Sequence, residues 1–269
     1  MINYLFSDLD GTLLNSQGTV SPQTVQAVRK SGLPMTLVSA RAPIEMRGAI
    51  QALGLTGPQI GFNGGLIFEY RQNQVQALQA APLEQALALQ VLDFIKATAP
   101  TVSLSCYTQS EWLTEKVDAG TRAEEQLTGQ IATPIASYAA QFSQHPAAIF
   151  KIMIMTLDNQ VMAALATALK QMVGSSASVK LSGQTYLEVT SAHAQKSRGI
   201  AFIKERFHLT TGELAAFGDG ENDLPMLKAV GLPIVMGNAD PTIQQYGQHV
   251  TKCNDEDGVA YALEHLIGR

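Results

Sequence analysis

Cysteine is scarce in this sequence, and long hydrophobic runs are absent. The 269 residues include two cysteines, Cys106 and Cys253, and neither belongs to a C-x-x-C pair. A disulfide framework or a zinc site is therefore not expected. No apolar run approaches the ~20 residues that a membrane span needs, and residues 1–7 lack the basic segment of a signal peptide. We therefore expect a cytoplasmic protein with no membrane partner.

Charged residues are also few, and they form no basic cluster. They make up 15% of the chain, and the formal net charge is −5. Proteins that bind nucleic acids usually carry a basic face, so no nucleic-acid partner is expected. Hydrophobic residues make up 46%, which indicates a globular protein with a substantial core rather than a disordered chain. The sequence does not fix the oligomeric state, and a monomer or homodimer is the default expectation.

Short apolar runs alternate with helical patterns in the first and last ~80 residues. Residues 2–7 and 35–38 are apolar runs that end at polar residues, as buried strands do. Between them, Ser21-Pro22 is a helix start, because Ser is a good N-cap and Pro suits the first helical position. Gly32 can close that helix. The alternation predicts an α/β fold with a parallel sheet and helices on both faces.

The middle of the chain has a different pattern. A helix is expected at 83–98, followed by strands at 101–107, 149–155 and 186–189. We interpret residues 83–188 as an inserted α+β domain, which leaves 1–82 and 189–269 to form the first domain together.

The run Asp8–Leu13 (DLDGTL) places two carboxylates at the end of the first expected strand. Open α/β sheets bind ligands at the carboxyl ends of their strands. The side chains of Asp8 and Asp10 would point to one side, where they repel each other unless one is protonated or both share a cation. Mg²⁺ prefers such oxygen ligands. One carboxylate could then serve as a nucleophile and the other as a general acid and base.

Three further motifs could contribute to the same chemistry. Ser39-Ala40-Arg41 follows the 35–38 strand, where a hydroxyl and backbone N–H groups can hold a phosphate. Lys196 opens a helix, an unfavourable place for a cation unless an anion is near. The run Gly218–Met226 (GDGENDLPM) follows another expected strand, and its Asp219 can ligate a cation. Each motif alone also fits a plain cap or a solvated residue.

Together these motifs resemble those of the haloacid dehalogenase superfamily, in particular its Cof-type branch of sugar-phosphatase-like enzymes. The D-x-D-G-T and G-D-x-x-N-D patterns are specific, and the motifs occur in the family's order. Asn63-Gly64 and the run Met236–Ala239 (MGNA) are weaker points of resemblance. The resemblance implies a Rossmann-like core with an α/β cap, and a Mg²⁺-dependent phosphatase that hydrolyses small phosphorylated metabolites, such as sugar phosphates, through an aspartyl-phosphate.

The resemblance also implies roles for individual carboxylates. Asp8 would be the nucleophile and a Mg²⁺ ligand. Asp10 would protonate the leaving oxygen and then activate water, while its backbone carbonyl ligates the metal. Asp219 would be the third protein ligand. Asp223 would orient the lysine or a metal-bound water, and Thr12 would support the site beside them.

Four residues would hold the phosphate if the resemblance extends to them. Ser39 and the N–H of Ala40 would bind phosphate oxygens, Lys196 would neutralise their charge, and Asn222 would contact them. Two of the motifs depart from the family's pattern. The phosphate loop usually reads T-G-R, whereas Ala40 stands here in place of Gly, and Ser197 stands where Gly usually follows the lysine.

Two alternatives to a phosphatase remain open at this point. A phosphohexomutase-like phosphoryl transferase would share the nucleophile and the metal, and a non-catalytic sensor would bind a phosphorylated ligand without turnover. The natural substrate is not readable from the sequence. In the cap, Tyr107, Trp112 and Glu188 are candidates for substrate contact, as is Arg41 in the first domain.

Overall fold

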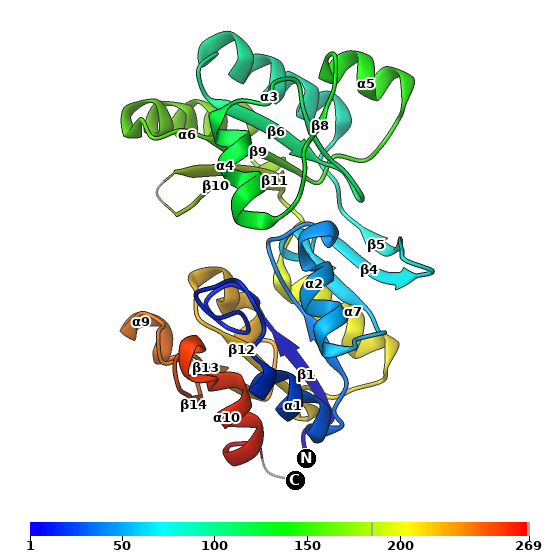
Figure 1. Ribbon diagram of the computed structural model, residues 1–269, viewed down its shortest axis with the longest axis vertical. Coiled ribbons are helices and arrows are strands. Elements are labelled where there is room, and N and C mark those ends of the chain that lie inside the picture. Colours follow the sequence, from blue (N-terminus) through cyan, green and yellow to red (C-terminus); the bar gives the residue numbers. More distant parts are fainter. Residues whose placement is uncertain (184, 268–269) are drawn as a thin grey trace. The chain divides into compact units, whose positions relative to one another are not determined.

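A computed structural model describes residues 1–183 and 185–267, and it divides the chain into two compact units (Figure 1). The core comprises Met1–Arg41, Met46–Gln79 and Gln195–Arg269, and the cap comprises Ala42–Glu45 and Ala80–Ala194. The main boundaries lie at 79/80 and 194/195, whereas the sequence placed them at 82/83 and 188/189. The later second boundary follows from the last cap strand, which stays paired through Ser191.

A parallel five-stranded sheet forms the centre of the core, in the order β14-β13-β12-β1-β2. Its strands are β1 (Tyr4–Ser7), β2 (Met35–Leu37), β12 (Leu214–Gly218), β13 (Leu232–Val235) and β14 (His249–Val250). Strands β1 and β12 are buried throughout, as expected for a sheet covered on both faces. The parallel sheet with an added cap confirms the predicted fold class.

Helices cover both faces of this sheet. On one face, Tyr4 and Phe6 of β1 share a hydrophobic cluster with Ile200 and Ile203 of α7. The intervening side chains of β1 face the opposite side, because strand residues alternate. Helices α1 and α10 pack against each other (Figure 1). The core helices are α1 (Pro22–Ser31), α2 (Pro43–Leu53), α7 (Lys196–Arg206), α8 (Leu224–Leu227), α9 (Pro241–Gln244) and α10 (Gly258–His265).

A small antiparallel sheet extends the core beside β2. It has the order β3-β4-β5, with β3 (Gln59–Gly61), β4 (Leu66–Arg71) and β5 (Gln74–Ala80). A short 3-10 helix, η1 (Phe62–Gly64), connects its first two strands. Asn63 has a φ of 55° there, a left-handed conformation that Asn tolerates better than most residues.

The cap is a six-stranded sheet with α3, α5 and α6 against one face and α4 against the other, where Gly120 lies beside Ser103 and Met155. The order is β10-β11-β9-β6-β7-β8, and all neighbours are antiparallel except β7 and β8. A cluster of buried apolar residues joins α3, α5 and α6 to β6, β9 and β11. The strands are β6 (Ser103–Tyr107), β7 (Trp112–Thr114), β8 (Thr133–Pro134), β9 (Lys151–Met155), β10 (Ala177–Ser182) and β11 (Tyr186–Ser191). The helices are α3 (Gln85–Thr98), α4 (Ala119–Thr128), α5 (Tyr138–Gln144) and α6 (Asn159–Val173).

The segment after Asp219 contains only a short helix. The structure has a 3-10 turn, η3 (Glu221–Asp223), followed by the four-residue α8. The proline after Leu224 suits a first helical turn, and Gly231 follows closely. Two other 3-10 turns are η2 (Thr211–Glu213) and η4 (Asn254–Glu256). Within the described residues, no helix is both long and apolar enough to span a bilayer.

Candidate active site

Three neighbouring strands end in residues of the predicted site. Asp8 follows β1, Asp219 follows β12, and Ser39 lies just beyond β2. Because these strands are parallel neighbours, their carboxyl ends meet at one edge of the sheet. The backbone of Asp8 is held in place, since its N–H donates to the carbonyl of Phe217 on β12 at 3.0 Å.

Lys196 joins two carboxylates across the site. Its Nζ lies 2.5 Å from Oδ1 of Asp8 and 2.6 Å from Oδ1 of Asp223. Its side chain is 1% exposed. A buried ammonium needs such partners, because burial of an unpaired charge is strongly unfavourable. The cation at the start of α7 is thus explained by the anions it faces.

Asp223 anchors the loop that carries Asp219. Its Oδ2 accepts hydrogen bonds from the backbone N–H groups of Asp219 and Gly220, both at 3.0 Å. The loop can close this tightly because Gly218 has no side chain: a Cβ there would lie 2.6 Å from the Cβ of Asp223. With Oδ1 on Lys196, both oxygens of Asp223 are engaged.

The turn after Asp8 packs directly against Asp219. Thr12 Oγ1 donates to Oδ1 of Asp219 at 2.6 Å. Gly11 has a φ of 76°, and a Cβ added to it would lie 2.4 Å from Oδ2 of Asp219. Glycine is therefore required here by both its conformation and its close approach to the carboxylate.

The carboxylate of Asp10 is held by Arg41 rather than by the acidic cluster. Nε of Arg41 donates to Oδ2 at 2.9 Å, and Nη2 donates to Oδ1 at 2.6 Å. This is the two-pronged geometry that makes arginine a specific partner of carboxylates. Asp10 remains 58% exposed. Sequence reasoning considered Arg41 only for substrate contact, since nothing in the sequence links it to Asp10.

The predicted phosphate-binding residues differ in their exposure to solvent. Ser39 is buried, and its Oγ accepts from the N–H of Arg41 at 3.1 Å, so its hydroxyl proton can donate to a ligand. The N–H of Asn63 donates to the Ser39 carbonyl at 2.8 Å, which gives the Asn63-Gly64 signal a structural role. Ala40 is half-buried, and Asn222 is exposed on η3.

Burial controls the protonation of these groups. Desolvation, aided by the charge of Asp223, raises the pKa of Asp8 well above its ordinary value, against the opposing effect of Lys196. Desolvation also raises the pKa of Asp219, more than its hydrogen bond with Thr12 lowers it. For Lys196 burial favours the neutral form, but the two carboxylates outweigh it and raise its pKa above the usual range. The site carries excess negative charge.

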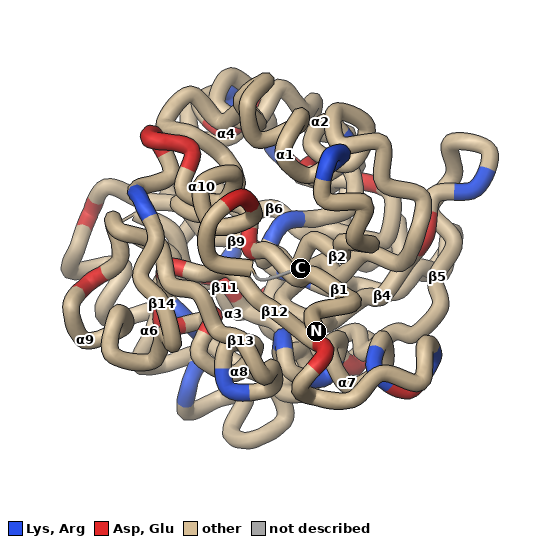
Figure 2. Tube along the Cα trace, turned by 90° about the horizontal axis from the view of Figure 1, so that it is seen from below, with Lys and Arg blue, Asp and Glu red and all other residues tan. Residues whose placement is uncertain are grey.

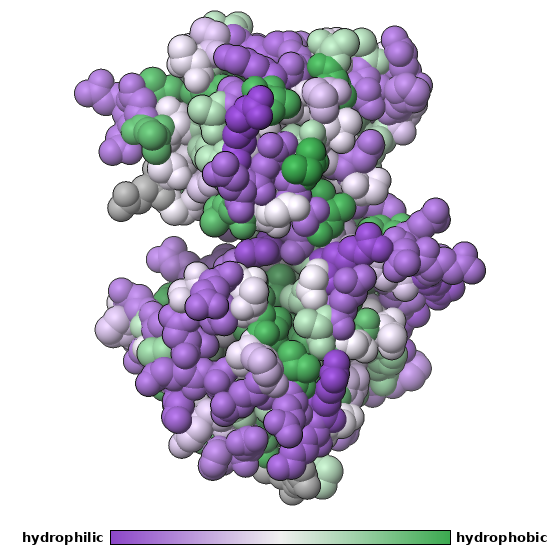
Figure 3. Space-filling view, viewed as in Figure 1, coloured by the Kyte–Doolittle hydropathy of each residue, from purple (hydrophilic) through white to green (hydrophobic). Residues whose placement is uncertain are grey.

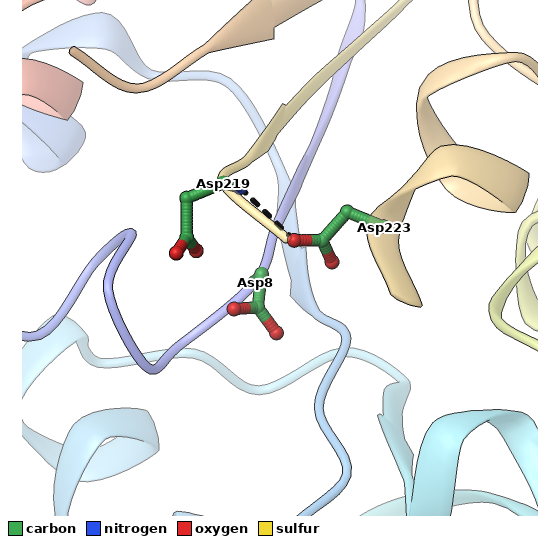
Figure 4. Close-up of side chains that lie close together, drawn as sticks. All are labelled: Asp8, Asp219 and Asp223. Atoms are coloured by element: carbon green, nitrogen blue, oxygen red, sulfur yellow. Dashed lines mark hydrogen bonds between the residues drawn. The ribbon is translucent and has the colours of Figure 1, made fainter. Parts of the chain in front are cut away.

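That donor set fits a hard divalent cation. One oxygen each from Asp8, Asp219 and Asp223 lie within 4.8 Å of one another. Figure 4 shows the three carboxyl groups converging from different segments. Because Asp223 has both oxygens engaged, a cation would be held chiefly by Asp8 and Asp219. Carboxylate oxygens are the ligands that Mg²⁺ prefers, and the cation would relieve their repulsion.

The cap residues predicted as candidates for substrate contact have partners within the cap itself. Tyr107 and Trp112 are buried and stack on each other, with ring centroids 5.7 Å apart. Oε1 of Glu188 lies 3.8 Å from Nζ of the buried Lys151. Both aromatic rings therefore serve in the cap's packing.

Comparison with known proteins identifies the group to which these features belong. Residues 5–263 match the family of haloacid dehalogenase-like hydrolases. A Haemophilus influenzae protein named as a phosphatase is 30% identical over 267 residues, covering 98% of each chain. The Bacillus subtilis 5-amino-6-(5-phospho-D-ribitylamino)uracil phosphatase YwtE is 24% identical, covering 97% of this chain and 96% of its own. An HMP-PP phosphatase of Yersinia pestis is 25% identical, with 97% and 93% covered.

Solved structures share the whole fold. A Thermotoga maritima protein superposes with a TM-score of 0.89 at 22% identity, covering 100% of this chain and 99% of its own. A haloacid dehalogenase-like hydrolase from Bacteroides thetaiotaomicron also gives 0.89, at 24% identity and with 99% and 100% covered. These matches include the core and the cap.

Proposed function

The chain belongs to the haloacid dehalogenase-like hydrolases and is a phosphatase, and we propose that it is a Mg²⁺-dependent enzyme that forms an aspartyl-phosphate on Asp8. The observation that carries this proposal is the environment of Asp8. Its carboxylate lies at a strand end, paired with the buried Lys196 and close to Asp219. Such a group is both positioned and charge-balanced for attack on an anionic phosphate.

The reaction would proceed in two displacements at phosphorus. First, a carboxylate oxygen of Asp8 bonds to phosphorus, the bond to the leaving oxygen breaks, and Asp10 gives that oxygen a proton. Water then attacks phosphorus and gives a proton to Asp10, and the bond to Asp8 breaks to release phosphate. Mg²⁺, when bound, would offset the negative charge that gathers on the phosphoryl oxygens.

The other site residues would bind and orient the phosphate. Lys196 would balance its charge, and the hydroxyl of Ser39 and the N–H of Ala40 would donate to its oxygens. Asn222 is exposed beside this edge and would contact it from the Asp219 loop. Asp223 and Thr12 hold Lys196 and Asp219 in place.

We propose small phosphomonoesters, with sugar phosphates and related metabolites first, as substrates. The name of one relative supports this class, since it is a phosphatase of 5-amino-6-(5-phospho-D-ribitylamino)uracil, and another is named for HMP-PP, which is also a small phosphorylated compound. We further propose a cytoplasmic monomer or homodimer that acts without nucleic-acid or membrane partners. Figure 2 supports the first of these exclusions, because in its view Lys and Arg are scattered along the trace among Asp and Glu rather than gathered in one long run.

Phosphate release from a panel of phosphorylated metabolites, with and without Mg²⁺, tests this function. We expect Mg²⁺-dependent release that Asp8→Asn abolishes, because the amide is a poor nucleophile of nearly the same size. Transfer of the phosphoryl group to a second hydroxyl, without free phosphate, would indicate a mutase. Binding of the compounds without turnover would indicate a sensor.

A further inference from the structure

Asn238 reaches from the loop after β13 to the turn beside the proposed nucleophile. Its Nδ2 donates to the carbonyl of Gly11 at 2.8 Å, although 227 positions separate the two residues. Its Oδ1 accepts from the backbone N–H of Asn254 at 3.0 Å. One side-chain amide thus links the turn after Asp8 to the loop at η4.

Asn254 makes a second link of the same kind. Its Nδ2 donates to the carbonyl of Leu14 at 2.9 Å. On the inner side of the turn, the carbonyl of Leu9 accepts from the N–H groups of Leu13 and Leu14, at 3.0 and 2.9 Å. The turn is therefore closed internally by backbone bonds and held externally by two asparagines, which we call the asparagine clasp (Asn238 and Asn254).

The loops that carry the clasp are themselves tightly constrained. The Gly237 N–H donates to the Lys252 carbonyl at 3.1 Å. A Cβ at Gly237 would lie 2.8 Å from the carbonyl oxygen of Thr251, and one at Gly258 would lie 2.2 Å from that of Lys252. The two segments pack backbone against backbone, so the clasp presents its amides from a rigid support.

The clasped turn is the one that contacts the proposed metal ligand. Gly11 lies directly against Asp219, with the left-handed φ and the close approach described above, and Thr12 donates to the same carboxylate. A small shift of the Gly11 peptide would therefore push into Asp219 or break its bond with Thr12. The orientation of one metal ligand depends on where the clasp holds the turn.

We propose that Asn238 and Asn254 are positioning residues that set the geometry of the Asp8–Asp219 cation site by holding the carbonyls of Gly11 and Leu14. The inference rests on the proposed function for the identity of the cation. It assigns a role to the Met236–Ala239 motif, which the reaction itself does not use. Because Asn238 is exposed, water competes for its hydrogen bonds. Loss of its side chain is therefore expected to change the affinity for Mg²⁺ only about 2- to 5-fold.

Amide hydrogen exchange in the metal-free full-length protein tests the clasp independently of catalysis. Asn238→Ala is expected to accelerate exchange in residues 9–14 while the unfolding temperature of the whole protein changes little. Asn15→Ala is the matched control, because the Oδ1 of Asn15 accepts bonds from Gln17 and Thr19 within its own loop. Unchanged exchange in residues 9–14, or equal acceleration in both variants, would overturn the proposal.

Calorimetric titration with Mg²⁺ then tests the effect on the cation site. Asn238→Ala should weaken Mg²⁺ binding about 2- to 5-fold, and Asn15→Ala should leave it unchanged. Asn238→Asp keeps the shape and adds a negative charge, but it places a carboxylate oxygen against the Gly11 carbonyl. We expect it to weaken binding at least as much as the Ala variant. Equal or tighter binding by Asn238→Asp would contradict a positioning role, whereas a wild-type protein that binds no Mg²⁺ would instead contradict the proposed function.

Discussion

Arg41 and Asp10 form the pair that determines how the proposed acid and base is presented. Both carboxylate oxygens of Asp10 accept from one guanidinium group. A proton on Asp10 removes its negative charge and therefore weakens both bonds to Arg41. The pair therefore orients Asp10 before the substrate binds, and it strengthens again as Asp10 gives its proton to the leaving oxygen and becomes a carboxylate.

Substitution of Arg41 is expected to lower kcat more than it weakens substrate binding. Arg41→Gln removes two charge-assisted hydrogen bonds, and we predict a loss of about 10- to 100-fold in kcat. Arg41→Lys keeps the charge but not the two-pronged geometry, so only part of the rate should return. Steady-state kinetics of both variants measure this. If Arg41→Gln mainly raises KM, Arg41 contacts the substrate instead of orienting Asp10.

At the scale of helices and strands, the ends of an element could be predicted from the sequence where they depend on residues adjacent in the chain. Ser21 caps α1 by accepting from the N–H of Thr24, and Gly32 ends that helix with a φ of 65°, as the sequence indicated. The elements that the sequence did not predict were β5, α4, α5 and the two-residue strands β8 and β14. Strand β5 and helix α4 are largely exposed, so an apolar periodicity was not available to reveal them. The links from Arg41 to Asp10 and from Asn238 to Gly11 depend on tertiary structure and carry no local signal.

Asp118 gives helix α4 a pH-dependent cap. Partial burial acts to raise the pKa of Asp118, but hydrogen bonds from Thr121 and Ser103 outweigh it and hold the pKa below its ordinary value. A lowered pKa means that the carboxylate stabilises the folded state above its unfolded pKa, and this stabilisation is lost as the pH falls through the folded value.

Removal of this N-cap carboxylate should therefore lower the stability of the protein at neutral pH but not in acid. Asp118→Ala is expected to destabilise the protein by about 1 kcal/mol at pH 7. The difference from wild type should shrink as the pH falls below about 4. Thermal unfolding across pH measures it, with Asp93→Ala on the exposed face of α3 as the control. A deficit that stays constant with pH would show that the carboxylate does not act as the cap.

At the scale of the whole molecule, the packed core contains carboxyl groups whose burial opposes their ionisation. In the view of Figure 3, hydrophilic side chains dominate the surface of both units, and the apolar residues are mostly buried. Against this background, the carboxylates at the ends of β1 and β12 are costly, because burial raises the pKa of both Asp8 and Asp219. Ionisation of both carboxyl groups in this site therefore costs stability, and a bound cation would offset that cost.

Mg²⁺ should consequently stabilise the folded protein, and Asp219→Asn should abolish the effect. Binding at 100 times Kd contributes about 2.7 kcal/mol, which thermal unfolding with and without Mg²⁺ would detect. The variant removes one repelling charge, so its metal-free form is expected to be at least as stable as wild type. A variant that still gains stability from Mg²⁺ would show that the cation binds elsewhere.

Trapping the phosphorylated form of Asp8 tests the aspartyl-phosphate directly. Substrate is mixed with the enzyme and Mg²⁺, the reaction is quenched with borohydride, and peptide 1–29 is analysed by mass spectrometry. Borohydride reduces an acyl phosphate to an alcohol, so we expect homoserine at position 8 when substrate is present and none in its absence. Rapid phosphate release with an unmodified Asp8 and a fully active Asp8→Asn variant would contradict it.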